Sequence, residues 1–276
     1  MNVQISEYKP SEWLNPYVEL FWTGEFNINS VDHLSQKVVP YGYVELIIHL
    51  SDDHCELLQG TDHAPSPDYT LIGMFTKPYA VHFKKHVKVF GIRFKPEGIY
   101  HTFGIPASEF HQNFVDMESF AGIHFRDFCS AIRKSNSASQ MISAAEKYFI
   151  KKINSSRLNL SYLNLAAELI RKRNGNILIN ELAGKVYIST RQLEREFKQK
   201  LGISPKGYMR IARLNDVNRK IISGRRIDLT EISFSTGYSD QAHFIRDFKH
   251  FTGASPKVFI NKREEYIVNP NTADLF

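Results

Sequence analysis

The stretch that decides the fold is a repeat in the C-terminal half of the chain. Its first copy reads ELAGKVYISTRQLEREFKQKLGISPK over residues 181–206, and its second reads EISFSTGYSDQAHFIRDFKHFTGASPK over residues 231–257. Equivalent residues lie 50 positions apart at the start of the copies and 51 apart from the second helical segment onward. The second copy therefore carries one additional residue in its turn. Such a repeat indicates that one supersecondary unit occurs twice.

Each copy has the pattern of a helix-turn-helix unit. Small residues, Ala183 and Ser233, stand where two short helices would cross closely. The second helix of each unit is predicted to begin at Ser189 or Asp240, both good N-cap residues. The residues expected to face the core from these second helices are spaced i and i+4, and they are Leu193, Phe197, Phe244 and Phe248.

Another face of each second helix is basic or carries amides, which suits the reading of base edges in a major groove. The candidate base-reading residues are Arg191, Gln192, Arg195, Gln241, His243 and Arg246. The candidate phosphate contacts are Thr190, Lys198, Lys206, Lys249 and Lys257. An alternative is that Arg195 and Arg246 are structural, in ion pairs with Glu194 or Asp247.

A longer helix is predicted between the two units, over residues 204–223. It begins at Ser204-Pro205, an N-cap followed by proline in the first turn, and it stops at Gly224. At 1.5 Å per residue this helix would be roughly 30 Å long. It would place the two second helices about 34 Å apart, which is one turn of DNA. One chain could then read two successive major grooves.

Residues from about 160 to 266 resemble the DNA-binding domain of AraC/XylS-type transcription regulators. The resemblance rests on GYSDQAHFIRDFK at residues 237–249, followed by Gly253 and Ser255-Pro256. It implies a bacterial, sequence-specific regulator that binds double-stranded DNA, with RNA polymerase as a further partner. Activator and repressor remain equal alternatives. Ala242 and Glu194 replace side chains that could read bases, so we expect no base contact from them.

The first part of the chain is predicted to be rich in β-structure, as a small barrel or sandwich. Residues 44–48 and 87–94 are runs of β-branched and aromatic residues, and turn residues separate them at 52–53, 60–67 and 77–78. Apolar residues at helical spacing then predict a helical hairpin over residues 118–152. The stretches at 40–46, 71–73 and 91–98 look like an uncharacterised β-rich sensor module that precedes such DNA-binding domains.

The expected fold class is therefore α+β, with two domains. Residues 1–155 would form the β-rich sensor or dimerisation domain with its hairpin, and residues 156–276 the all-α DNA-binding domain, with a core at about 160–266. The formal net charge of +6 is divided unevenly, at −3 for residues 1–155 and +9 for residues 156–276. A basic C-terminal part favours a polyanion as its partner.

Composition excludes several other classes of protein. No apolar run is long enough for a membrane helix, no signal peptide is visible, and the two cysteines form no C-x-x-C motif, so we expect a cytoplasmic protein. We find no P-loop, G-x-G-x-x-G or G-x-S-x-G motif, and we expect neither an enzyme nor a cofactor. The remaining enzymatic alternative is a methyl-acceptor DNA-repair regulator that uses Cys55 or Cys129 as its reactive thiol.

Two charged residues in the β-rich part are candidates for binding an effector. Glu45 and Arg93 are each embedded in an apolar strand, so they must pair with one another or with a ligand. Nine of eleven histidines precede residue 125, but His82 and His86, if on one strand, would be roughly 13 Å apart, and we expect no metal site.

Oligomerisation and the type of signal are two further open points. We expect a homodimer formed through the hairpin, the alternative being that its apolar stripe packs on its own β domain. A small-molecule effector is expected, and control by protein partners is the alternative.

Overall fold

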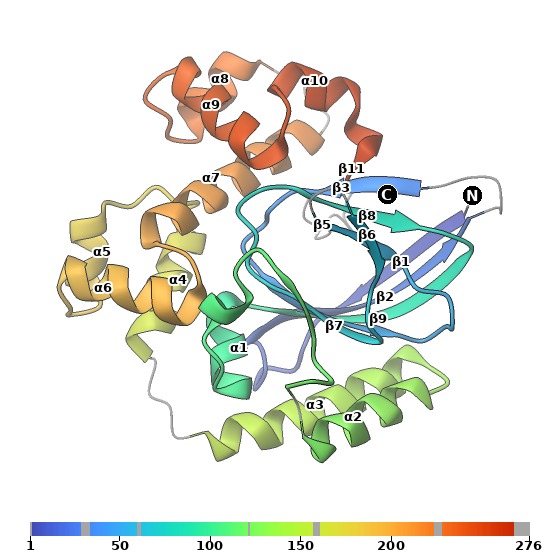
Figure 1. The fold of residues 1–276 in the computed structure, drawn as a ribbon. Coiled ribbons are helices and arrows are strands. Elements are labelled where there is room, and N and C mark those ends of the chain that lie inside the picture. Colours follow the sequence, from blue (N-terminus) through green and yellow to red (C-terminus); the bar gives the residue numbers. More distant parts are fainter. Residues whose placement is uncertain are drawn as a thin grey trace.

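The computed structural model describes residues 2–28, 34–59, 62–120, 122–156, 161–223 and 228–267. Its fold is α+β, as predicted: two β-sheets and a helical hairpin come first, and a set of short helices follows (Figure 1). Among these residues no helix is long and apolar enough to cross a membrane.

Two sheets make up the β-rich part. Within the described residues, neighbouring strands pair antiparallel, except that β11 and β3 are parallel. In spatial order, the first sheet contains β1 (Asn2–Tyr8), β2 (Val18–Asn27), β9 (His86–Phe94), β4 (Val44–His49), β7 (Tyr69–Ile72) and β10 (Phe114–Asp116). The second contains β11 (Tyr266–Ile267), β3 (Leu34–Val38), β8 (Tyr79–Phe83), β5 (Glu56–Gln59) and β6 (Asp62–Pro65).

The strands expected at 44–48 and 87–94 are confirmed as β4 and β9. Two details of the expectation are wrong. The stretch 60–67, taken as a turn, contains β6, which pairs with β5. His82 and His86 do not share a strand, because His82 lies on β8 of the second sheet and His86 begins β9 of the first, and Lys85 between them adopts a positive φ of 53°.

The six-stranded sheet is covered on both faces. Phe26, Ile47 and Val89 pack towards the second sheet, whereas Leu46 and Phe94 pack towards helices. All six residues of β4 are consequently buried, which explains why only Glu45 and His49 interrupt its apolar sequence. The helices on this side are α1 (Pro96–Phe103), α2 (Ile123–Arg133) and α3 (Ala138–Ser155), with a short 3₁₀ turn, η1 (Ala107–Phe110), between α1 and β10.

Helices α2 and α3 are the predicted hairpin. Its apolar stripe, which includes Phe125, Phe128 and Phe149, is buried in the same cluster as Leu46 and Phe94 of the sheet. The stripe therefore packs on its own β-rich part, and its burial needs no second copy of the chain. At the start of the hairpin, Ile123 remains 64% exposed.

The C-terminal part is helical, as the repeat predicted. Its helices are α4 (Ser161–Lys172), α5 (Ile179–Lys185), α6 (Thr190–Glu196), α7 (Pro205–Ile222), α8 (Leu229–Ser235), α9 (Gln241–Thr252) and α10 (Pro256–Asn261), with short helical turns η2 (Phe197–Leu201) and η3 (Arg263–Glu265). The Ser204 side chain caps α7 by accepting from the Gly207 N–H. The predicted stop at Gly224 lies outside the described residues.

The end of the described chain departs from the all-helical expectation. After η3 the chain forms β11, which pairs in parallel with Lys37 and Val38 of β3. Val39 and Met74 of the β-rich part also lie in the apolar cluster of the helical part. The two parts thus share both a sheet and a core.

Gly237 is required by the turn between α8 and α9. Its φ is +82°, and a Cβ there would lie 2.0 Å from Asn176 Oδ1.

We expect Gly237→Ala to lower the free energy of unfolding by about 1–3 kcal/mol, because it combines backbone strain with a clash. Gly184→Ala is the matched control: its Cβ meets nothing within 4 Å in α5, and it should stabilise by about 0.5–1 kcal/mol. Urea unfolding measures both, and equal effects would refute the assignment.

Candidate nucleic-acid interface

Helices α6 and α9 are the second helices of the two repeat units. Ser189 Oγ accepts from the Gln192 N–H at 3.1 Å, and Asp240 Oδ1 accepts from the His243 N–H at 2.7 Å. Both predicted N-caps are therefore present. The four residues predicted to face the core are fully buried: Leu193, Phe197, Phe244 and Phe248.

The candidate base-reading side chains lie on the remaining surface of these helices. Arg191, Gln192, Gln241 and Arg246 are exposed. Arg195 is also exposed, and its Nη2 lies 3.2 Å from Glu196 Oε1. The structural alternative expected an ion pair between Arg195 and Glu194, whereas in the structure Arg195 pairs with Glu196.

His243 is held more firmly than the other candidates. Its ring packs edge-on against Tyr238, and its Nδ1 lies 3.3 Å from Ser239 Oγ. Its Nε2 is 3.9 Å from Asp247 Oδ1. The side chain is half-buried, so only part of its ring faces solvent. Whether these six residues read bases remains a prediction.

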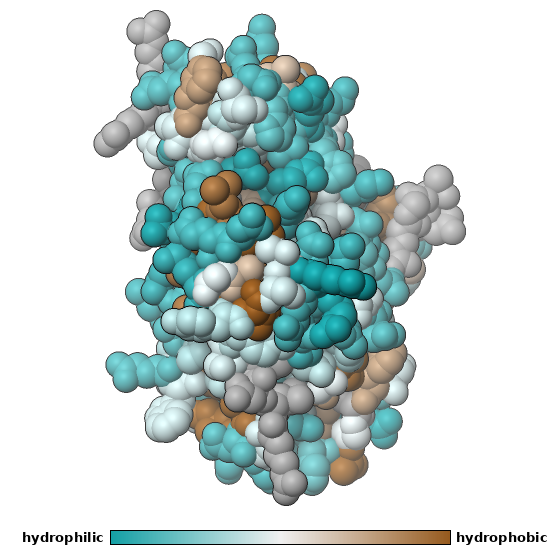
Figure 2. All heavy atoms as spheres, turned by 90° about the vertical axis from the view of Figure 1, so that its left-hand side faces the viewer, coloured by the Kyte–Doolittle hydropathy of each residue, from teal (hydrophilic) through white to brown (hydrophobic). Residues whose placement is uncertain are grey.

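The candidate phosphate contacts are placed at helix starts and on outer faces. Lys198, Lys206, Lys249 and Lys257 are exposed, whereas Thr190 is half-buried at the start of α6. Lys206 follows Pro205 in the first turn of α7, where exposed N–H groups favour anions. Hydrophilic residues cover most of the face on the α5 and α6 side of the molecule (Figure 2).

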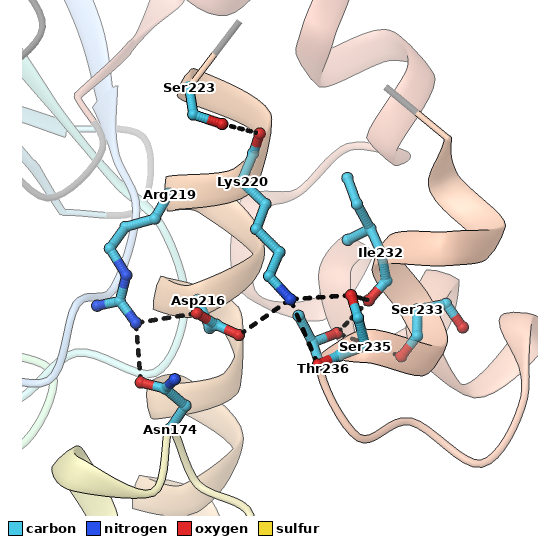
Figure 3. A network of polar contacts seen from close by, with 9 residues as sticks. All are labelled: Asn174, Asp216, Arg219, Lys220, Ser223, Ile232, Ser233, Ser235 and Thr236. Carbon is cyan, nitrogen blue, oxygen red and sulfur yellow. Dashed lines mark hydrogen bonds and ion pairs between the residues drawn. The ribbon is translucent and has the colours of Figure 1, made fainter. Parts of the chain in front are cut away.

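Helix α7 joins the two units, and polar contacts from its last turns hold both of them (Figure 3). Arg219 Nη2 donates to Asn174 Oδ1, after α4, at 2.8 Å and to Asp216 Oδ1 at 3.0 Å. Lys220 Nζ donates to Ser235 Oγ, at the end of α8, at 2.8 Å. Asp216 Oδ2 lies 3.6 Å from the same Lys220 Nζ. One carboxylate therefore orients two cations that reach opposite units.

A second contact fixes α9 directly on α7. Arg210 Nε and Nη2 donate to the two oxygens of Asp247 at 3.0 and 2.8 Å, a bidentate pair. The Asp247 side chain is 6% exposed and Arg210 packs over the Phe251 ring. Asp247 therefore pairs with Arg210, and not with Arg246 as the structural alternative proposed.

Sequence reasoning missed these linking residues. The spacing of Asp216 with Arg219 and Lys220, at i+3 and i+4 on a predicted helix, was a usable signal. The pair of Arg210 and Asp247 spans 37 positions and had no such signal.

Glu196 is the corresponding centre in the first unit. Its carboxylate accepts from Tyr162 Oη at 2.6 Å, Lys200 Nζ lies 2.5 Å from it, and Arg195 lies on its other oxygen. Burial alone would raise the pKa of Glu196, but the bonds from Lys200, Tyr162 and Arg195 outweigh it and lower the pKa to about 2. The carboxylate is ionised at neutral pH and ties α4 to α6.

In the β-rich part, the effector candidates Glu45 and Arg93 face one another across β4 and β9. Arg93 Nε donates to Glu45 Oε1 at 2.7 Å, and Tyr41 Oη donates to Glu45 Oε2 at 2.6 Å. Both charged side chains are buried between the sheets. The alternative in which they pair with one another is the arrangement found, while a role in ligand binding is untested.

The two cysteines offer little to thiol chemistry. Cys55 and Cys129 are both buried, and desolvation raises the pKa of each thiol. A nucleophilic cysteine requires the opposite shift and access to solvent. The methyl-acceptor alternative therefore lacks structural support.

Comparison with known proteins gives two family matches. Residues 182–262 match a family described as a helix-turn-helix domain. Residues 6–116 match a domain of unknown function (DUF6597).

Curated relatives include the Msm operon regulatory protein of Streptococcus mutans, 29% identical over 100 residues, which are 36% of this chain and 36% of that protein. The arabinose operon regulatory protein of Escherichia coli is 33% identical over 92 residues, or 33% of this chain and 31% of that protein. The chain thus spans about a third of the length of these relatives.

Among solved structures, ToxT from Vibrio cholerae aligns over 87% of this chain and 98% of its own, with 10% identity and a TM-score of 0.49. An AraC-type DNA-binding domain-containing regulator from Chromobacterium violaceum covers 37% of this chain and 92% of its own, with 28% identity and a TM-score of 0.34.

The lowered pKa of Glu196 predicts how stability depends on pH. Because the pKa of Glu196 in the folded state lies below its unfolded value, the stabilisation that this carboxylate gives the fold is complete above about pH 4.5 and is lost as pH falls towards about 2. Glu196→Gln should lower the free energy of unfolding at about pH 7 by on the order of 1–3 kcal/mol and flatten this acid dependence. Glu194→Gln, an exposed neighbour, is the control. Urea unfolding at about pH 7 and about pH 3 measures both, and equal pH profiles for the two variants would contradict the assignment.

Proposed function

Because residues 182–262 form a helix-turn-helix domain of the AraC type, we propose that this protein is a sequence-specific DNA-binding regulator of transcription. The observation that carries the proposal is the pair of reading helices, α6 and α9, held on one continuous helix, α7. Each presents exposed arginine and glutamine side chains, and residues 156–276 carry a net charge of +9.

In the proposed mechanism, affinity for DNA and specificity for its sequence come from different residues. Lysines such as Lys206 and Lys257 contact phosphates and release counterions, which gives affinity without sequence preference. Arg191 and Arg195 of α6, and Gln241 and Arg246 of α9, contact base edges in two major grooves. Because α7 has 18 residues, it is roughly 27 Å long, and we expect it to hold α6 and α9 about one turn of DNA apart.

Selection of bound duplexes from a random DNA pool by the full chain tests the proposal. We expect one enriched sequence with two conserved half-sites about one helical turn apart. Binding should weaken steeply as salt rises, with a log–log slope of several units. A pool that remains random after selection, or an affinity that ignores salt, would reject the function.

The two classes of contact are separated by a pair of variants. Arg246→Ala should cost about 1–3 kcal/mol on the selected site and relax base preference in one half-site only. Lys257→Ala should weaken all sequences about equally and reduce the salt slope by about one unit. Fluorescence anisotropy on selected and scrambled duplexes measures both. An unchanged base preference for Arg246→Ala would show that α9 does not read bases through it.

We infer further that the β-rich part controls the reading part in response to a small-molecule effector. The support is a direct contact: Asn215 Nδ2 of α7 donates at 2.9 Å to the Tyr41 carbonyl, and the Tyr41 hydroxyl binds Glu45. An effector that alters the ion pair of Glu45 and Arg93 would act on α7 through Tyr41, which contacts both Glu45 and Asn215. It must bind the two arrangements of the chain with different affinity. A thermal-shift screen of metabolites on the full chain identifies it, and control by a protein partner is the outcome if none stabilises.

We propose a homodimer in the cytoplasm, with RNA polymerase as the partner through which transcription is changed. Phe120 and Ile123 remain 57% and 64% exposed where the hairpin begins, and they offer an apolar contact. Light scattering on the full chain at tens of micromolar should report a dimer, and Ile123→Ser should shift it towards monomer. If light scattering instead shows that the parent chain is a monomer, the homodimer proposal is wrong and regulation must take place within a single chain.

A further inference from the structure

Three side chains that the DNA-binding proposal does not use converge on the outer face of the five-stranded sheet. They are Glu56 on β5, His63 on β6 and His82 on β8, and these three strands are neighbours (Figure 1). Glu56 lies directly opposite His82 in the strand register, whereas His63 is opposite Leu58, two positions along β5. Alternation along a strand places all three on one face, while Leu57 and Val81 point into the core.

The three side chains are close enough to share one ion. Their potential ligand atoms, one from each residue, all lie within 4.8 Å of one another. His63 Nδ1 is 3.8 Å from Glu56 Oε2, and the two imidazole rings are 4.3 Å apart between centroids. Tetrahedral zinc with bonds of about 2.0–2.2 Å needs ligand atoms about 3.4 Å apart. Small side-chain rotations therefore complete the geometry.

One oxygen of the Glu56 carboxylate is already engaged by a lysine. Lys84 Nζ donates to Glu56 Oε1 at 2.6 Å. Because Lys84 occupies Oε1, the oxygen that faces His63 is the other one, Oε2. A metal ion can bind Oε2 without displacing the lysine.

His82 has the kind of second contact that metal-binding histidines usually have. Its Nε2 lies 3.0 Å from Ser35 Oγ on β3. When Nε2 donates this bond, the lone pair is carried by Nδ1, which is the form that a metal ligand requires. The contact with Ser35 thereby orients the His82 ring.

We propose that Glu56, His63 and His82 form a binding site for a divalent transition metal ion of the zinc class. Two imidazoles and one carboxylate match the ligands that Zn²⁺ takes in proteins, whereas Mg²⁺ and Ca²⁺ prefer oxygen alone. The His63 side chain is 39% exposed, so the ion is reached from solvent and water completes its coordination. Bound metal would link three strands of the sheet that also receives β11.

The site was not predicted from the sequence, which compared His82 with His86. In the structure His86 turns instead to Asn27 and Glu25 of β2. The residues that do meet His82 are 19 and 26 positions away in the chain, on strands that only sheet pairing brings together. This proposal stands whether or not the DNA-binding proposal holds.

Calorimetric titration of the chelator-treated full chain with zinc chloride tests the site, with Co²⁺ absorption as a second readout of tetrahedral coordination. We expect a single ion per chain and a weakening of at least about tenfold in His63→Ala, His82→Ala and Glu56→Gln. His124→Ala, an exposed histidine on α2, is the matched control and should bind as the parent does.

Circular dichroism on each variant confirms that the fold is retained, and Glu56→Gln keeps the test valid if a histidine variant does not fold. Absence of binding by the parent chain overturns the proposal. So does equal affinity in the parent and the three site variants, or a loss confined to His124→Ala, because either result would place the metal elsewhere.

Discussion

The ion pair between Arg210 and the buried Asp247 is the contact on which the arrangement of the two helix-turn-helix units depends. It fixes α9 on α7, and the Asp247 carboxylate has almost no access to water. Removing the arginine would leave a buried charge without its partner, at a cost of about 3–5 kcal/mol when both groups are buried. Because Arg210 is 37% exposed, the lower end of that range applies. The orientation of α9 is therefore held by electrostatics as well as by packing.

The first unit reaches the same result by a different arrangement. There Glu196 gathers Tyr162, Lys200 and Arg195, so that a carboxylate inside the unit ties α6 to α4. Asp216 then joins the two units through Arg219 and Lys220. Glu196 and Asp247 occupy equivalent positions of the repeat, 51 residues apart, but the partners of the two carboxylates differ.

The helical C-terminal part also packs firmly on the β-rich part. Arg171 of α4 forms a bidentate pair with the buried Glu97 of α1, at 2.6 and 3.1 Å, and also donates to the Tyr208 hydroxyl. Together with β11 and the bond from Asn215 to Tyr41, this interface connects α7 to the strands that carry Glu45 and Arg93. A change among those strands has a short physical route to α7 and, through it, to α6 and α9.

The sequence by itself determined the elements whose cause is local. The caps at Ser189, Ser204 and Asp240, the core pairs at helical spacing and the largely apolar strand β4 all follow from neighbouring residues, and the structure has each of them. The exposed face of α6 and α9 follows for the same reason, since the residues that point away from the core are set by helical periodicity.

Only the tertiary structure decided which distant groups meet. The parallel pairing of β11 with β3, the pair of Arg210 and Asp247, and the meeting of Glu56, His63 and His82 join residues whose sequence spacing carries no periodic signal. A buried charge must find a partner, but the sequence does not say which one. That choice is made when sheets and helices pack, because packing alone brings the side chains within bonding distance.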